Sequence, residues 1–124
     1  MRSRIGPLAA AIAISFSLNL AQADAKDRQM VKVGEVPHLK TPVCIDPSTI
    51  VTKANGMTYW ESGLFCDPSP DMWQRVGTDC KQDLSAKMLM EIKIDYDSGK
   101  ESRDSTDTSS GMGQEIRYIC GRPH

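Results

Sequence analysis

Apolar and polar residues alternate along one stretch in the second half of the chain, and this alternation predicts the clearest element. Every second position between residues 84 and 96 is apolar or aromatic, while most residues between them are charged or polar: Leu84, Ala86, Met88, Met90, Ile92, Ile94 and Tyr96 form the apolar set. A period of two is typical of an antiparallel strand with one buried face. The pattern predicts a long strand over residues 84–96, with this set on the buried face.

A β-hairpin is predicted upstream of that strand. Residues 48–52 are rich in β-branched side chains, and residues 57–66 contain several large apolar ones. Between them lies Asn55-Gly56, a pair that favours a two-residue type I′ turn because both residues accept a positive φ. This turn would pair hairpin positions whose numbers add up to 111.

Prolines recur in the rest of the first half of the chain. Residues 30–33 predict a short first strand, and Pro37, Pro42 and Pro47 argue against a helix after it. A loop is expected over residues 67–71. The segment that follows it, residues 72–77, fits a half-buried helical turn or an irregular connection.

The C-terminal part divides into a polar segment and a final element. Residues 97–110 contain no apolar side chain and predict a flexible loop outside the core. Residues 111–120 predict a helix, because Met112, Ile116, Ile119 and Cys120 share one helical face. Gly121 and Pro123 form a helix stop signal. The alternative is a short strand with Ile116, Tyr118 and Cys120 inward.

The first 23 residues have the features of a secretory signal peptide. Arg2 and Arg4 precede an uncharged stretch, and Ala21-Gln22-Ala23 fits a cleavage site. The uncharged stretch is shorter than the roughly 20 residues that span a bilayer. Cleavage would leave 101 of the 124 residues, enough for one small domain. Because the first cysteine is Cys44, no lipid anchor is expected at the new N-terminus. The sequence therefore predicts a periplasmic or secreted protein.

Four cysteines in an exported chain of this size predict two structural disulfides. Hairpin register places Cys44 across from Cys66, with a bulge near Pro47 absorbing an offset of one residue. Cys80 has the parity of the long strand's apolar face, and Cys120 lies on the apolar face of the predicted helix. We therefore expect the pairs Cys44–Cys66 and Cys80–Cys120. The cysteine spacings match no zinc-binding pattern.

The combination of these features resembles the surface-adhesin protein E family. The resemblance spans about residues 43–120 and rests on four features. They are the stretch 45–51 with its Asn-Gly turn and Trp60, the segment Asp79-Cys80-Lys81, the strand ending near Tyr96, and the last helix with Cys120. It implies an α+β fold, a small antiparallel sheet with a C-terminal helix docked on it by a disulfide. The chain would then divide into a signal peptide (1–23), a polar segment with a short strand (24–42) and a protein E-like core (43–124). Members of the family are exposed bacterial proteins that bind host matrix and plasma proteins, and some form dimers.

Charge and candidate chemistry argue for binding rather than catalysis. The mature chain has 13 basic and 16 acidic residues, a net charge of −3, and no basic stripe, so nucleic-acid binding is not expected. Neither of its two histidines, His38 and His124, lies in a recognisable catalytic motif. The acidic residues between positions 67 and 79 are explained by the preference of turns for aspartate. The methionines of the long strand fit core packing better than copper binding. We expect no enzyme activity, no cofactor and no metal.

Aromatic residues are the candidates for a protein-binding surface: Tyr59, Trp60 and Trp73. Tyr59 and Trp60 point to opposite faces of a strand, so one of them should lie on the outer face. If it is Tyr59, a loop or a second copy of the chain, in a homodimer, would cover the patch of Met57, Tyr59 and Phe65. The expected function is therefore an exported envelope protein that binds host proteins or other envelope components. The alternative is a small periplasmic inhibitor of an enzyme such as a lysozyme.

Overall fold

The computed structural model describes residues 28–121, which form an antiparallel sheet of six strands and one C-terminal α-helix. The predicted α+β class is confirmed. The strands follow one another across the sheet in sequence order: β1 (Val31–Val36), β2 (Thr41–Thr52), β3 (Thr58–Leu64), β4 (Trp73–Thr78), β5 (Met88–Ile94) and β6 (Glu101–Asp107). A short 3-10 helix, η2 (Pro70–Met72), precedes β4, and the helix α2 (Gly111–Cys120) closes the fold.

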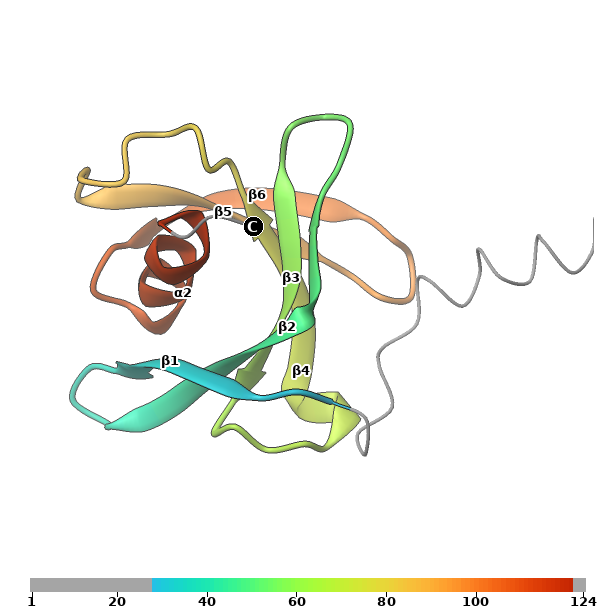
Figure 1. The fold of residues 1–124 in the computed structure, drawn as a ribbon, viewed down its shortest axis with the longest axis vertical. Coiled ribbons are helices and arrows are strands. Elements are labelled where there is room, and N and C mark those ends of the chain that lie inside the picture. The colour runs from blue at the N-terminus through green and yellow to red at the C-terminus, as the bar shows by residue number, and fades with distance from the viewer. Residues whose placement is uncertain (1–27, 122–124) are drawn as a thin grey trace, which may run out of the picture.

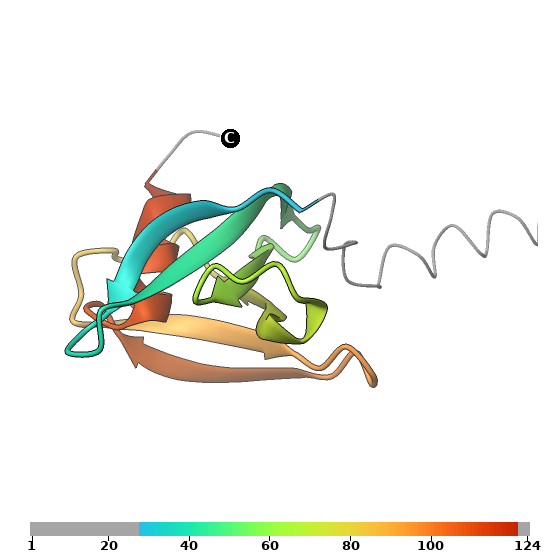
Figure 2. The ribbon, with the colours of Figure 1, turned by 90° about the horizontal axis from the view of Figure 1, so that it is seen from below.

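The sheet curls around the helix. In Figure 1, α2 lies between an arm made of β1 and β2 and an arm made of β5 and β6, and β3 and β4 join the two arms. The side chains inside this curl form the main core: Ile45, Trp60, Val76, Leu89, Ile116 and Ile119, each at most 1 % exposed. Figure 2 shows the turn between β5 and β6 extending away at the end of these strands farthest from α2.

Register assigns the two faces of the sheet. Trp60 pairs with Val76, and both belong to the core around α2. Their neighbours Tyr59 and Gly77 pair with each other and therefore lie on the opposite, outer face, where Gly77 also pairs with Ile92. Tyr59 is 1 % exposed and Ile92 is fully buried, so both faces of the sheet are covered at its centre.

Both predicted disulfides are confirmed. Cys44 is bonded to Cys66, and Cys80 is bonded to Cys120 in α2. The first bond ties β2 to the turn after β3, and the second holds the end of α2 against the segment between β4 and β5. Two disulfides are consistent with a protein that matures outside the reducing cytosol.

The hairpin exists, but its predicted turn is wrong. Thr52 pairs with Thr58 rather than with a residue that would make the sum 111. Gly56 alone takes a positive φ, of 85°, and the N–H of Lys53 donates to the carbonyl of Met57 over 2.9 Å. The longer turn leaves Asn55 free to accept a hydrogen bond from the Met57 N–H with its side chain.

Two other segments form strands where none was predicted. Residues 41–52 are one strand, because Pro42 and Pro47 lie within β2, where the register is irregular between residues 46 and 51. Residues 73–78 form β4 rather than a helical turn or an irregular connection. Pairing with both β3 and β5 gives this mixed sequence an extended backbone.

The long predicted strand is shorter than expected and its faces are distributed differently. β5 begins at Met88, and residues 79–87 form turns. Met88 is 51 % exposed, whereas Leu89 on the other face is 1 % exposed and belongs to the core around α2. The prediction that the even-numbered set is the buried face is therefore wrong at Met88. The helix covers the odd-numbered face.

The polar segment 97–110 is not a flexible loop. Residues 101–107 form β6, which pairs with β5 along the whole length of that strand. Its side chains are almost all exposed, and backbone pairing alone gives it its structure. An edge strand with polar and charged side chains on both faces is a common way to prevent further strand addition.

The final helix is confirmed over residues 111–120. The Ser110 hydroxyl caps it by accepting from the Gly113 N–H over 3.0 Å, and Gly121 follows its last residue. The predicted signal peptide, residues 1–23, lies outside the described residues. The described part contains no helix of the length and hydrophobicity needed to cross a membrane.

Candidate functional site

A cleft opens between α2 and the inner side of the curled sheet. We call it the helix–sheet cleft, and its cavity volume is about 380 Å³. The first half of α2, the end of η2, the start of β4, and residues of β1, β2, β3 and β5 all contribute to it. Its lining residues are Val36, Val43, Ser62, Gly63, Leu64, Asp71, Met72, Trp73, Gln74, Glu91, Lys93, Gly111, Met112 and Glu115. Most of the walls are apolar, and acidic groups are set among them.

Glu115 is the most deeply buried acid of the cleft. It projects from α2, is 2 % exposed, and accepts hydrogen bonds from Trp60 Nε1 over 2.9 Å and from the Ser62 hydroxyl over 2.8 Å. Desolvation raises the pKa of this carboxyl to about 7, an effect that the two donors partly oppose and the negative charge of Glu91 reinforces. Glu115 therefore changes charge near neutral pH.

Glu91 is the second acid. Register places it on the same face of β5 as Leu89 and Lys93, toward α2, and it is 9 % exposed. Among the described residues, no side chain or backbone group forms a hydrogen bond or ion pair with its carboxylate. Lys93 lines the same cleft but is exposed and makes no ion pair with Glu91. The Glu91 oxygens are not among the enclosed unpaired side-chain atoms of the described residues, so the carboxylate opens onto the cleft.

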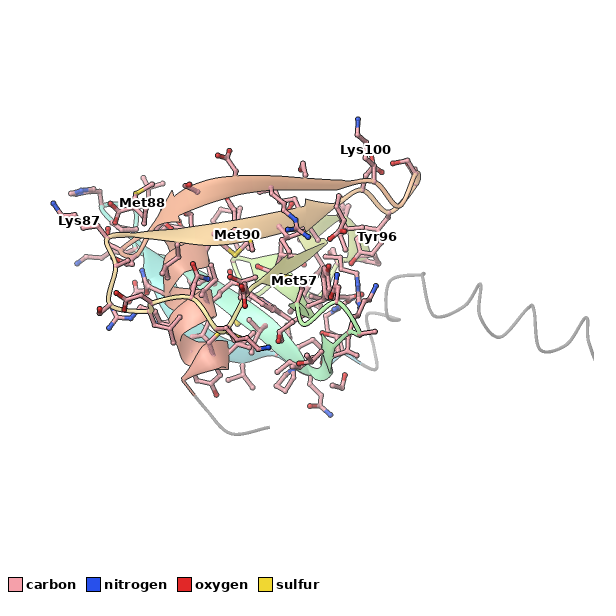
Figure 3. All side chains as sticks on the ribbon, turned by 90° about the horizontal axis from the view of Figure 1, so that it is seen from above. Met57, Lys87, Met88, Met90, Tyr96 and Lys100 are labelled. Atoms are coloured by element: carbon pink, nitrogen blue, oxygen red, sulfur yellow. A yellow bond between two sulfur atoms is a disulfide. The ribbon has the colours of Figure 1, made fainter. Side chains whose placement is uncertain are left out.

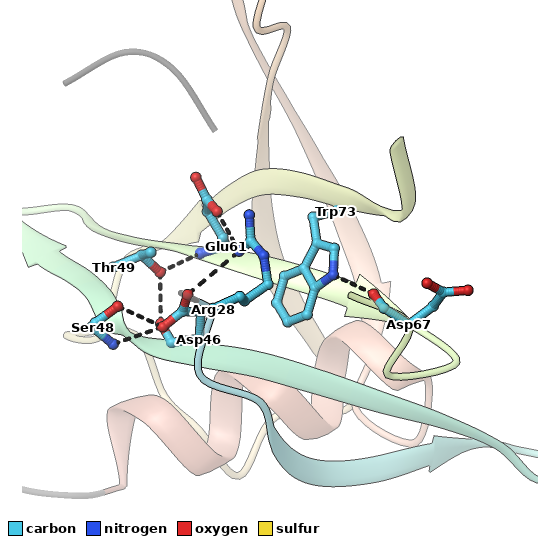
Figure 4. Close-up of polar contacts among 7 residues, drawn as sticks. All are labelled: Arg28, Asp46, Ser48, Thr49, Glu61, Asp67 and Trp73. Atoms are coloured by element: carbon cyan, nitrogen blue, oxygen red, sulfur yellow. Dashed lines mark hydrogen bonds and ion pairs between the residues drawn. The ribbon is translucent and has the colours of Figure 1, made fainter. Parts of the chain in front are cut away.

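The outer face of the sheet holds a buried ionic cluster. The Arg28 guanidinium lies 2.5 Å from a Glu61 carboxylate oxygen and 3.5 Å from one of Asp46, and it stacks 4.1 Å above the ring of Trp73. Figure 4 shows Arg28 between these carboxylates and the indole. Asp46 also accepts from the Ser48 N–H and hydroxyl. This network attaches the chain preceding β1 to the middle of the sheet.

A second cavity, of about 300 Å³, lies at the turn between β5 and β6. Its floor is Tyr59, whose hydroxyl donates to Glu101 over 2.7 Å and whose ring lies 4.8 Å below the Lys53 ammonium. Burial and the nearby Glu101 carboxylate raise the pKa of Tyr59. In Figure 3, Tyr96 and Lys100 mark this end of the hairpin and Lys87 and Met88 mark the other.

The three aromatic residues proposed as a binding surface lie in the interior. The exposed fraction is 1 % for Tyr59, 0 % for Trp60 and 3 % for Trp73, and the three side chains lie on two faces of the sheet. The structure does not bring them together on an exposed patch. Only Trp73 lines the helix–sheet cleft. In the patch built around Tyr59, Phe65 is 55 % exposed, whereas Tyr59 is covered by its own chain at Lys53.

The remaining candidates have local roles. His38 is exposed in the turn between β1 and β2, and His124 lies outside the described residues. Asp67 and Asp79 accept the backbone N–H groups of residues two positions ahead, as expected of turn residues. No group of three metal-ligating side chains occurs within residues 28–121.

Sequence reasoning missed Glu91 and Glu115. Glu115 had a signal, because position 115 falls on the apolar stripe of the helix, three residues after Met112 and four before Ile119. Glu91 had none, since a glutamate on the odd-numbered face of an alternating strand is indistinguishable from a solvated one.

Comparisons of the chain with family models, with curated proteins and with solved structures give no match. The residues of the helix–sheet cleft are therefore the basis for the function proposed below.

Proposed function

We propose that this protein is an exported, non-enzymatic binding protein of the bacterial envelope, with a fold of the surface-adhesin protein E type. In this proposal the helix–sheet cleft binds a segment of a protein partner, either a host matrix or plasma protein or another envelope component. The observation that carries the proposal is the cleft itself, with apolar walls, buried carboxyl groups and a volume within the range of ligand-binding pockets.

The construction around the cleft supports binding. Two disulfides brace the elements around the cleft, one joining β2 to the turn after β3 and the other joining α2 to the segment between β4 and β5. A preorganised cleft loses less entropy when a ligand binds than a flexible one does. At its mouth Leu64 is 42 % exposed, as expected of an apolar contact that a partner would cover.

Affinity capture tests this proposal with three forms of the mature chain, residues 24–124. Leu64→Lys places a charge at the mouth of the cleft. Leu39→Lys makes the same change in the turn between β1 and β2, where Leu39 is 73 % exposed and away from the cleft. Each form is immobilised and exposed to envelope extract and, separately, to plasma and matrix proteins. Wild type and Leu39→Lys should retain the same partner, and Leu64→Lys should lose it. Equal retention by all three forms would contradict binding in the cleft.

Localisation has its own test. In the proposal the leader is removed after residue 23, so intact-mass analysis of protein from the envelope or medium should give a chain that begins at Asp24. Recovery of only the uncleaved chain would contradict export by this route. Sedimentation velocity on the same material decides between a monomer and a homodimer.

The enzyme-inhibitor alternative also gains an observation. An inhibitor needs a rigid projecting loop, and the projecting turn at residues 95–100 is braced by internal hydrogen bonds. Asp95 accepts the N–H groups of Asp97 and Gly99, and its own N–H donates to the carbonyl of Lys100. An assay of lysozyme activity with increasing mature protein tests it. Inhibition by wild type that is lost in Lys100→Glu would favour this alternative over the cleft.

A further inference from the structure

The helix–sheet cleft has the chemistry of a receptor for one long cationic side chain. This inference rests on the proposed function and specifies which part of a partner the cleft would hold. Its starting point is Glu91, a carboxylate that is 9 % exposed, lines the cleft, and has no hydrogen-bonding or ionic partner within residues 28–121. A carboxylate that opens onto a cleft and has no partner of its own can accept charge-assisted hydrogen bonds from a cationic group without losing an existing contact.

The charges around the cleft favour a cation. Two buried carboxyl groups face each other from different elements, Glu91 from β5 and Glu115 from α2, and Asp71 of η2 lies at the rim. The one basic side chain of the lining is Lys93, which is exposed at the mouth. The cleft therefore has three acidic groups and one basic group, and its negative charges are the more deeply placed.

The walls fit an aliphatic stem. Val36, Val43, Leu64 and Met112 are apolar side chains that line the same cleft as the two carboxyl groups. Lysine and arginine are the side chains that combine such a stem with a cationic head, and they bury their methylene groups along apolar surfaces. A divalent metal ion would use the carboxylates but would leave these walls without a contact.

We propose that the helix–sheet cleft binds a lysine or arginine side chain of a protein partner, with its stem between Leu64 and Met112 and its cationic head against Glu91. Glu115, already held by Trp60 and Ser62, supplies a second negative charge behind the first. The cationic head then lies between two carboxyl groups and gives Glu91 an ionic partner.

The test uses small probes, so that it does not depend on knowing the partner. The folded mature chain, labelled with ¹⁵N, is titrated with the Nα-acetyl methylamides of lysine, arginine and norleucine. Norleucine has a similar stem without the charge. The probes are followed to about 50 mM, above the millimolar Kd expected for a single side chain. Lysine or arginine should give saturable shifts at residues 62–64, 91–93 and 112–115, and norleucine should bind at least about tenfold more weakly.

Two variants separate a specific contact from general electrostatics. Glu91→Gln removes the proposed contact, and Asp104→Asn removes the same charge from the residue that pairs with Glu91 on exposed β6. We expect Kd for the lysine probe to rise about tenfold or more in the first and by less than about twofold in the second. Between pH 6 and 8, Kd in wild type should fall as Glu115 ionises. The other charged groups on this side of the sheet are Glu91 and Lys93 of β5, Asp71 of η2, and Asp104 of β6, which pairs with Glu91.

The outcomes distinguish this inference from the proposed function. Equal binding of norleucine, unchanged affinity in Glu91→Gln, or no saturable shift with any probe would overturn the cationic site. So would shifts at the cleft with calcium chloride alone. If Leu64→Lys still abolishes capture of a protein partner in that case, the proposed function stands and the cleft recognises something other than a basic side chain.

Discussion

The buried carboxyl of Glu115 should make the stability of this protein depend on pH in a way that one substitution removes. Its pKa lies at about 7 in the folded protein, against 4.5 for an unperturbed glutamate. Below pH 4.5 the group is protonated in both folded and unfolded chains. Between pH 4.5 and 7 the unfolded chain releases the proton while the folded protein retains it. The free energy of unfolding therefore falls by about 3 kcal/mol across this interval because of Glu115, and this contribution is constant above it.

Glu115→Gln keeps an oxygen for the Trp60 indole but cannot ionise. The variant should therefore gain about 3 kcal/mol relative to wild type between pH 4.5 and 7.5, since all other groups titrate in both proteins. Urea unfolding with intact disulfides, followed by tryptophan fluorescence at half-unit steps of pH, measures this difference. Glu35→Gln, at an exposed position, should stay within about 0.5 kcal/mol of wild type throughout. A Glu115→Gln difference that is constant or falls with pH would refute the assignment of a raised pKa to this carboxyl.

Three further substitutions test the rest of the structure by the same unfolding measurement. Arg28→Met leaves two buried carboxylates without their cation and should cost about 3–5 kcal/mol; an unchanged midpoint would contradict the burial of this cluster. Gly63→Ala places a Cβ 2.4 Å from the ring of Trp73 and should cost roughly 1–3 kcal/mol, so a neutral effect would mean that the indole moves freely. Serine at both Cys80 and Cys120 opens a bond that spans 40 residues and should cost about 4 kcal/mol; a loss below about 1 kcal/mol would argue against this constraint on the unfolded chain.

The cysteines show how a correct prediction can rest on incomplete geometry. The pair Cys44–Cys66 was expected from facing positions of a hairpin, yet Cys44 pairs in register with Gly63. Cys66 reaches it because Phe65 and Cys66 both take a left-handed backbone conformation and turn the chain back. Hydrophobic pattern carries no information about such a turn. The pairing of Cys80 with Cys120 was likewise expected because position 80 has the parity of the strand's apolar face. In the structure, residue 80 precedes β5 and lies in a turn.

The segment 97–110 and the acids of the cleft show what a single sequence leaves out. β6 has no apolar side chain to indicate it, and its structure comes from the backbone groups of β5. The alternation in β5 correctly predicted a strand. It could not identify the face that α2 covers, because a strand inside a sheet can be buried on both of its faces. The sequence pattern therefore placed Glu91 among the solvent-exposed residues. Its burial depends on a helix that follows twenty residues later.

The order of the strands has a consequence for how this chain reaches its final form. Each strand pairs with the one just before it in sequence, so the sheet can grow from β1 to β6 in the order in which the chain is delivered, with short loop closures throughout. The helix alone must return across the finished sheet. Until it docks, the concave surface around Trp60 is open to water. The core is therefore complete only when this last ten-residue element packs into the curl, and the Cys80–Cys120 bond then holds it there.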